Sequence, residues 1–120
     1  MAQVDLGMMY EKGRVGATNY AAAFTWYKKA ADQGDPKGQT GIAQLYFFGR
    51  GVPQDDHKAF EWFEKSANQG YARAQNFLGF MYAEGQGVKK DKAEAIKWYQ
   101  KAADQGSPEA KTRLSQLQSK

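Results

Sequence analysis

Residues 74–109, AQNFLGFMYAEGQGVKKDKAEAIKWYQKAADQGSPE, determine the fold because the rest of the chain repeats them. Residues 2–37 match this stretch at 18 of 36 aligned positions, and residues 38–73 keep the same spacing. A repeat of this length indicates a stack of similar units that share one continuous core. The sequence therefore predicts a single domain over residues 1–120, built of three repeats and a partial fourth at 110–120.

Each repeat is predicted to form two helices. In the third repeat, apolar residues recur at helical spacing up to Tyr82, and Gly85 follows where a helix would end. Asp91 has the side chain of an N-cap for a second helix. The pattern predicts six helices in three hairpins, a seventh near 109–118 and no β-sheet. This is an all-α, right-handed α-solenoid with a C-terminal capping helix.

Residues that stay the same in all repeats are assigned to packing and to helix ends. Three tryptophans lie 36 residues apart on the apolar stripe of the second helices, so we interpret them as core rather than as an aromatic ligand site: Trp26, Trp62 and Trp98. Three glycines with the same period are predicted to take a positive φ where those helices end: Gly34, Gly70 and Gly106.

Composition fits a folded domain. Hydrophobic residues make up 42% of the chain and charged residues 25%. The absence of cysteine excludes disulfides and zinc-thiolate sites. No apolar stretch approaches the roughly 20 residues of a membrane span, and the first residues lack the features of a secretory signal. We expect a soluble protein, cytoplasmic or, if an N-terminal signal was removed, periplasmic.

The chain resembles the Sel-one-like repeat (SLR) family, a relative of the tetratricopeptide repeats with a longer unit. The pattern that carries the resemblance is AQxxLGxxYxxGxGVxxD at 74–91 and AxxWxxKAAxxG at 95–106. The resemblance implies a scaffold or adaptor that binds other proteins, often in bacterial envelope, secretion and signalling settings. Some cysteine-rich members have been linked to penicillin-like ligands, and none of that is carried over to a chain without cysteine.

No motif brings catalytic or ligand-binding groups together. His57, the only histidine, is predicted to lie on the surface. The Gly-x-Gly segments at 49–51 and 85–87 follow helices rather than strands, so we interpret them as turns and not as phosphate-binding loops. Asp55 and Asp91 recur at helix starts, which is typical of caps rather than metal ligands. We therefore predict that the protein is not an enzyme and binds no cofactor or metal.

Positions that change from repeat to repeat are free of the shared packing role. Along the first helices they fall on one face, which in the tetratricopeptide repeats lines a concave groove. Several are apolar and have polar neighbours, as is typical of a partner-binding surface. The predicted partner is another protein or peptide rather than a small molecule. The predicted partner-binding residues are Met8, Thr40, Gln44, Phe47, Phe48, Arg73, Asn76 and Phe80.

Three alternatives stay open. Phe47 and Phe48 could merely fill the turn between repeats. The net charge of +4 mildly favours acidic partners, and a nucleic-acid binder would use the basic residues Lys89, Lys90, Lys92, Lys97 and Lys101. Met1 directly precedes a repeat, so the chain could also be an excised or self-associating fragment of a longer bacterial SLR protein.

Overall fold

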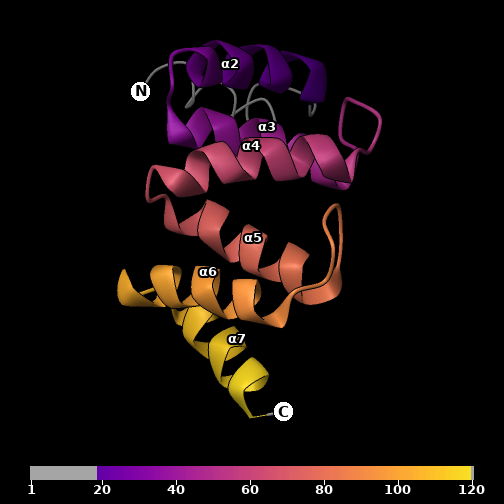
Figure 1. The fold of residues 1–120 in the computed structure, drawn as a ribbon. Coiled ribbons are helices and arrows are strands. Elements are labelled where there is room, and N and C mark those ends of the chain that lie inside the picture. Colours follow the sequence, from indigo (N-terminus) through magenta and orange to yellow (C-terminus); the bar gives the residue numbers. More distant parts are fainter. Residues whose placement is uncertain (1–18, 120) are drawn as a thin grey trace.

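The computed structural model describes residues 19–119. Within this range no strand occurs, and the helices follow one another from α2 at one end to α7 at the other (Figure 1). The helices are α2 (Tyr20–Asp32), α3 (Pro36–Phe48), α4 (Asp56–Asn68), α5 (Ala72–Glu84), α6 (Lys92–Asp104) and α7 (Pro108–Gln118). The predicted all-α solenoid is confirmed, and α7 is the predicted seventh helix. The predicted first helix of the first repeat lies outside the described residues.

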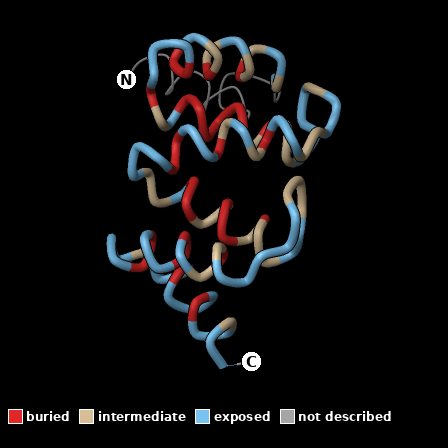
Figure 2. The backbone as a smooth tube through the Cα atoms, in the orientation of Figure 1, coloured by how far each residue is buried: buried red, intermediate tan, exposed pale blue. Residues whose placement is uncertain are grey.

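Helices that are neighbours along the chain make the main contacts. Among the described elements, α2 packs on α3, and the same holds for each following pair up to α6 and α7. The helices α3, α5 and α7 each stand first in their repeat, and α4 and α6 stand second. The buried residues form rows along the inner sides of the helices, while the turns are largely exposed (Figure 2).

Side-chain caps fix the starts of most helices. The carboxylate of Asp55 accepts a hydrogen bond from the Lys58 amide, and that of Asp91 accepts one from the Glu94 amide, both at 3.1 Å. Before α7, the Ser107 hydroxyl caps the helix in the same way and is followed by a proline. The predicted capping roles of Asp55 and Asp91 are confirmed, because each satisfies an amide that has no partner within its helix.

Glycines in the left-handed region end the helices. Gly34, Gly70 and Gly106 have φ of 83°, 92° and 94°, as predicted. Gly85, which ends α5, has φ of 69°. A side chain at such a φ costs roughly 1–2 kcal/mol, which explains why glycine recurs at these positions with the period of the repeat.

The fully buried aromatic residue of each second helix is the one that follows the tryptophan. Tyr27, Phe63 and Tyr99 are at most 3% exposed. Of the tryptophans, only Trp98 is buried, while Trp26 and Trp62 are partly exposed. Trp62 packs against the edge of the core. The prediction that the tryptophans form the core is therefore confirmed for Trp98. It is not confirmed for Trp26 and Trp62, which are partly exposed.

A lysine three residues after each tryptophan contacts the indole ring. The Nζ atom lies over the indole ring at 4.6 Å for Lys29 and Trp26, and at 4.4 Å for Lys65 and Trp62. In the third repeat, the Lys101 Nζ atom lies 5.4 Å from the centroid of the Trp98 ring. A cation over an indole face contributes about 0.5–1 kcal/mol at exposed sites. For Trp62 and Trp98, the lysine thus covers one face of a ring that also packs on the core.

A glutamine ladder connects each repeat to the next. The Gln69 Nε2 donates to the carbonyl oxygen of Gly34 at 2.9 Å and to the Gln39 Oε1 at 2.8 Å. The same two bonds recur 36 residues later at 2.8 Å each, from Gln105 to Gly70 and Gln75. Each glutamine thus donates to the glycine carbonyl at the end of a second helix in the preceding repeat. The bond satisfies that carbonyl and connects the two repeats.

Candidate partner-binding site

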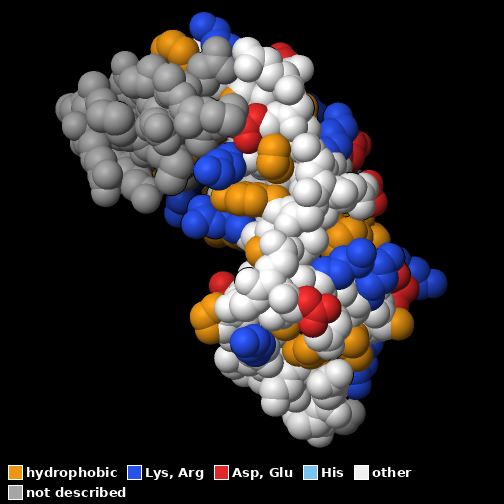
Figure 3. Space-filling view, turned by 90° about the vertical axis from the view of Figure 1, so that its left-hand side faces the viewer, with side chains coloured by type: hydrophobic (Ala, Val, Ile, Leu, Met, Phe, Trp, Pro, Cys, Tyr) orange, Lys and Arg blue, Asp and Glu red, His pale blue; other side chains and the backbone are white. Residues whose placement is uncertain are grey.

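A hollow of about 630 Å³ runs across α3, α5 and α7. Apolar side chains supply most of its wall, and polar groups surround them. A space-filling view of one side of the molecule shows exposed hydrophobic patches interspersed with Lys and Arg (Figure 3). The hollow is lined by six of the eight residues predicted from repeat variation: Gln44, Phe47, Phe48, Arg73, Asn76 and Phe80.

A cluster of phenylalanine rings forms the apolar wall of the hollow. The Phe47 ring lies edge-on to Phe48, Phe77 and Phe80, with centroids 4.9, 5.5 and 6.1 Å away. Phe77 in turn stacks on the buried Phe63 at 4.4 Å. Phe47 and Phe77 therefore join the wall to the core below. The alternative that Phe47 serves packing is in part correct, because its ring is partly buried among these neighbours.

Phe48 differs from the other rings of the cluster. It is 46% exposed and is the one large hydrophobic side chain classed as exposed among residues 19–119. The Arg50 guanidinium lies 4.6 Å from the ring centroid and covers one face. The edge of the hollow thus carries a large apolar surface in contact with water, which the fold does not use for its own core.

Thr40 does not belong to the hollow, contrary to the prediction. Its side chain is in the core, 2% exposed, with the Oγ1 atom 2.7 Å from the Ser66 hydroxyl. Because Ser66 donates its single hydroxyl hydrogen to the Pro36 carbonyl oxygen, Thr40 donates to Ser66. At the equivalent position of the next repeat, Asn76 bonds Ser107 of the α7 cap instead. Met8, also predicted, lies outside the described residues.

Six lining residues were not predicted: Ala72, Phe77, Tyr99, Ser107, Glu109 and Arg113. Phe77 and Arg113 occupy the same position in successive repeats, with Gly41 one repeat before them. The residue at this position changes from glycine to phenylalanine to arginine, as strongly as at the positions that were predicted to bind a partner. Comparison of the repeats at that offset would have found both residues, so the signal was present in the sequence.

Most polar groups of the hollow come from α5 and α7, and Gln44 of α3 adds one more. The Asn76 Nδ2 donates to the Ser107 hydroxyl at 3.0 Å, which ties α5 to the cap of α7. Asn76 Oδ1 is buried and has no hydrogen-bond partner. Arg73, Glu109 and Arg113 place charged groups around the same hollow. The site therefore combines an aromatic wall with a charged and amide-bearing border.

Tyr99 forms a further part of the lining. Burial raises the pKa of Tyr99 from 10.0 to about 12; the positive charge of Arg113 opposes this rise, and the negative charges of Glu109 and Glu84 add to it. Gly79 of α5 packs against this ring: a Cβ there would lie 2.8 Å from ring carbons. The absence of a side chain at position 79 therefore lets α5 and α6 approach this closely.

Tyr99 makes the stability of the protein depend on alkaline pH. Because its pKa is higher in the fold than in the unfolded chain, folding holds this proton more tightly. The resulting stabilisation is complete below pH 10.0 and is lost as the pH rises through about 12. We expect the free energy of unfolding, measured by urea titration at stepped pH, to fall across this window. Tyr99→Phe should reduce the fall. An unchanged fall in Tyr99→Phe would contradict the assignment.

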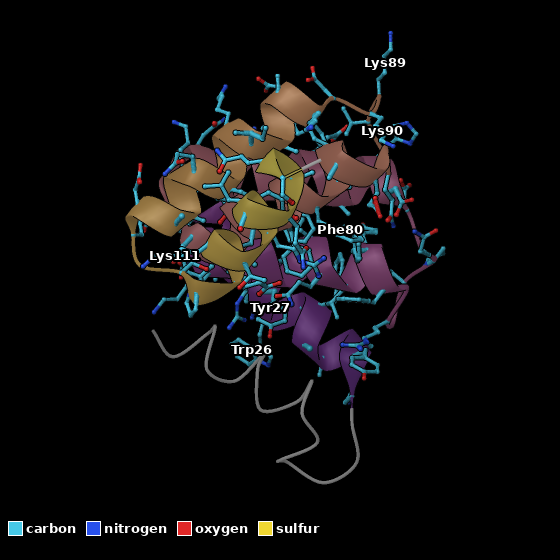
Figure 4. All side chains as sticks on the ribbon, turned by 90° about the horizontal axis from the view of Figure 1, so that it is seen from below. Trp26, Tyr27, Phe80, Lys89, Lys90 and Lys111 are labelled. Atoms are coloured by element: carbon cyan, nitrogen blue, oxygen red, sulfur yellow. The ribbon has the colours of Figure 1, made fainter. Side chains whose placement is uncertain are left out.

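Other chemistry is sparse in the part of the chain that the structure describes. No group of three or more His, Asp or Glu side chains there could hold a metal ion. No helix between residues 19 and 119 is both long and apolar enough to cross a membrane. His57 is exposed on α4, as predicted. Lys89 and Lys90 lie on a different side of the molecule from Lys111 (Figure 4).

The family model described as Sel1 repeat matches residues 1–35, 36–71 and 72–107. The chain belongs to the Sel1 repeat family. The second and third matched segments begin with α3 and α5, so each described Sel1 repeat is a helical hairpin. Sel1 repeats are in general protein-interaction folds without catalytic activity. A comparison with curated proteins gives no match.

Solved Sel1 repeat structures are similar over nearly the whole chain. A Sel1 repeat protein from Oxalobacter formigenes is 41% identical, with a TM-score of 0.84, over 96% of this chain and 86% of that one. A protective antigen of uropathogenic Escherichia coli with an SLR fold is also 41% identical, with a TM-score of 0.86. That match covers 91% of this chain but 23% of the antigen. Cysteine-rich protein B of Helicobacter pylori, 24% identical with a TM-score of 0.77 over 95% and 98% of the two chains, shares the fold.

Proposed function

We propose that this Sel1 repeat chain is a scaffold that binds a segment of a partner protein in the hollow across α3, α5 and α7. The observation that carries the proposal is Phe48, which is 46% exposed at the edge of an aromatic wall. A large exposed apolar side chain surrounded by polar groups is typical of a protein-binding surface.

The interior of the hollow supports the same function. Phe47 and Phe77 are held by the core, so they form a preformed wall and do not need to be ordered on binding. Arg73 and Gln44 offer hydrogen bonds at the border. Aromatic and arginine residues contribute most to binding energy in many interfaces. The volume of about 630 Å³ admits a few side chains of an extended segment or of one helical face.

Replacing Phe48 with alanine should weaken partner binding about three- to ten-fold and change thermal stability little. Full burial of a phenylalanine contributes about 1.5–3 kcal/mol. Because nearly half of this side chain is exposed in the free protein, binding can gain about half of that amount. Partners would be captured from a lysate with the whole chain, and their affinity for wild type and Phe48→Ala would be measured by calorimetry.

The matched control for this experiment is Lys97→Glu. Lys97 is exposed on α6, away from the residues of the hollow. This variant should bind the partner as the wild type does. Loss of binding in Lys97→Glu together with normal binding in Phe48→Ala would place the interface elsewhere and reject the proposal. Phe80→Ala is a weaker test, because Phe80 also packs against α6 and α7 in the core.

A further inference from the structure

We propose that the segment bound in this hollow is acidic as well as apolar. An aromatic or aliphatic side chain of the segment packs on the phenylalanine wall, and a carboxylate of the same segment pairs with Arg73 and Arg113. The inference rests on the proposed binding function and adds the chemistry of the partner. It comes from the charges that surround the aromatic wall.

The charged side chains of the hollow favour an anion. Two arginines line it, Arg73 and Arg113, against one acid, Glu109. No carboxylate between residues 19 and 119 forms an ion pair with either arginine. Both guanidinium groups are on exposed residues, so their charge is available to a ligand. A guanidinium binds a carboxylate with two parallel hydrogen bonds, a geometry that an ammonium group cannot offer.

The position of Arg73 is unfavourable for the helix that carries it. Arg73 lies in the first turn of α5, where the helix dipole favours acids and disfavours cations. At the equivalent position of α7 the chain has Glu109, as the dipole favours. Lys37, at the equivalent position of α3, is also a cation and does not line the hollow. Helix stability therefore explains neither cation, but of the two only Arg73 places its charge at the hollow.

Arg113 brings the second positive charge to the hollow. Its side chain and the Tyr99 ring line the same space. Glu109 is four residues earlier on α7, a spacing that permits an ion pair, yet the two charged groups do not come within 4.0 Å of each other. Arg113 is thus adjacent to the aromatic wall and keeps the capacity to pair with an incoming carboxylate.

A displayed library of random peptides, selected against the whole immobilised chain, tests this chemistry directly. The selected peptides should contain Asp or Glu within a few residues of an aromatic or aliphatic residue. Peptides selected against the double variant Arg73→Gln/Arg113→Gln should no longer be enriched in acidic residues but should still contain the apolar ones. A synthetic copy of a selected peptide should bind this variant about ten-fold more weakly, and its Glu→Gln form should bind wild type with a similar loss.

The double variant Lys89→Gln/Lys90→Gln is the matched control. It removes the same net charge at exposed lysines that lie away from Phe80 (Figure 4). This control should select acidic peptides as the wild type does. Selected peptides that are basic or uncharged, and that Phe48→Ala no longer binds, would overturn the acidic partner while leaving the binding site in place. Peptides whose affinity is unchanged by Phe48→Ala would overturn the proposed function itself.

Discussion

Phe63→Ala is expected to destabilise the protein by about 3–5 kcal/mol, the usual cost of deleting a fully buried phenylalanine. Phe63 is 0% exposed, lies in the core cluster that joins α3 to α6, and stacks on Phe77 at 4.4 Å. Its loss would leave a cavity below the wall of the hollow. Since domains of this size are stable by about 5–15 kcal/mol, the change removes a large share of the total. Urea unfolding followed by circular dichroism measures it.

Trp62→Ala is the matched comparison, because the two residues are neighbours in α4. Trp62 is partly exposed and has Lys65 over one face. We expect its removal to cost about 1.5–3 kcal/mol, less than that of Phe63. If Trp62→Ala cost as much as Phe63→Ala or more, the tryptophans would be the main core residues after all. Phe63→Leu, which keeps most of the volume, supplies a measurable value if the alanine variant does not fold.

Gly38→Ala is expected to destabilise the protein by about 1–3 kcal/mol, although the repeats suggest the opposite. Alanine stands at the equivalent positions Ala74 and Ala110, and alanine favours a helix by about 1 kcal/mol over glycine. At position 38, however, an added Cβ would lie 2.7 Å from the Ala31 amide nitrogen and 2.9 Å from the Tyr27 carbonyl oxygen. These are main-chain atoms, so α2 and α3 would have to move apart.

Lys37→Ala is the control for the glycine change. Lys37 is the exposed neighbour of Gly38 in the same helix, so its replacement should change the free energy of unfolding by no more than about 0.5 kcal/mol. Both variants are compared with wild type by thermal and urea unfolding. A more stable Gly38→Ala protein would mean that α2 and α3 can separate at little cost, and that the repeat consensus is the better guide here.

The repeats predicted those features that depend on local rules. Helix positions, the caps at Asp55 and Asp91, and the positive φ of Gly70 each follow from a residue and its near neighbours in sequence. Each repeat carries the same local pattern, so a helix boundary that is ambiguous in one repeat can be assigned from the others. The face of the first helices that lines the hollow also followed from comparing copies, since residues that differ there are released from the shared core.

Depth within a helix face could not be predicted in the same way. Trp62 and Phe63 are adjacent on one wide apolar stripe, about 100° apart around the helix axis. Which of them is more deeply buried depends on how closely the facing helix approaches, and small residues on that helix decide this. The prediction for Thr40 was wrong for a related reason. Whether a variable position faces water or a neighbouring helix depends on residues distant in sequence, and for Thr40 that residue is Ser66.

The order of contacts in the stack has a consequence for local opening. In the described part, α7 makes its main contacts with α6, whereas α3, α4, α5 and α6 are each held between two neighbours. Amide hydrogens in α7 should therefore exchange with solvent sooner than those in α5. Each opening of α7 carries Glu109 and Arg113 away from the hollow. A segment bound across α5 and α7 would hold α7 closed, so occupancy of the hollow and exchange protection of this helix should rise together.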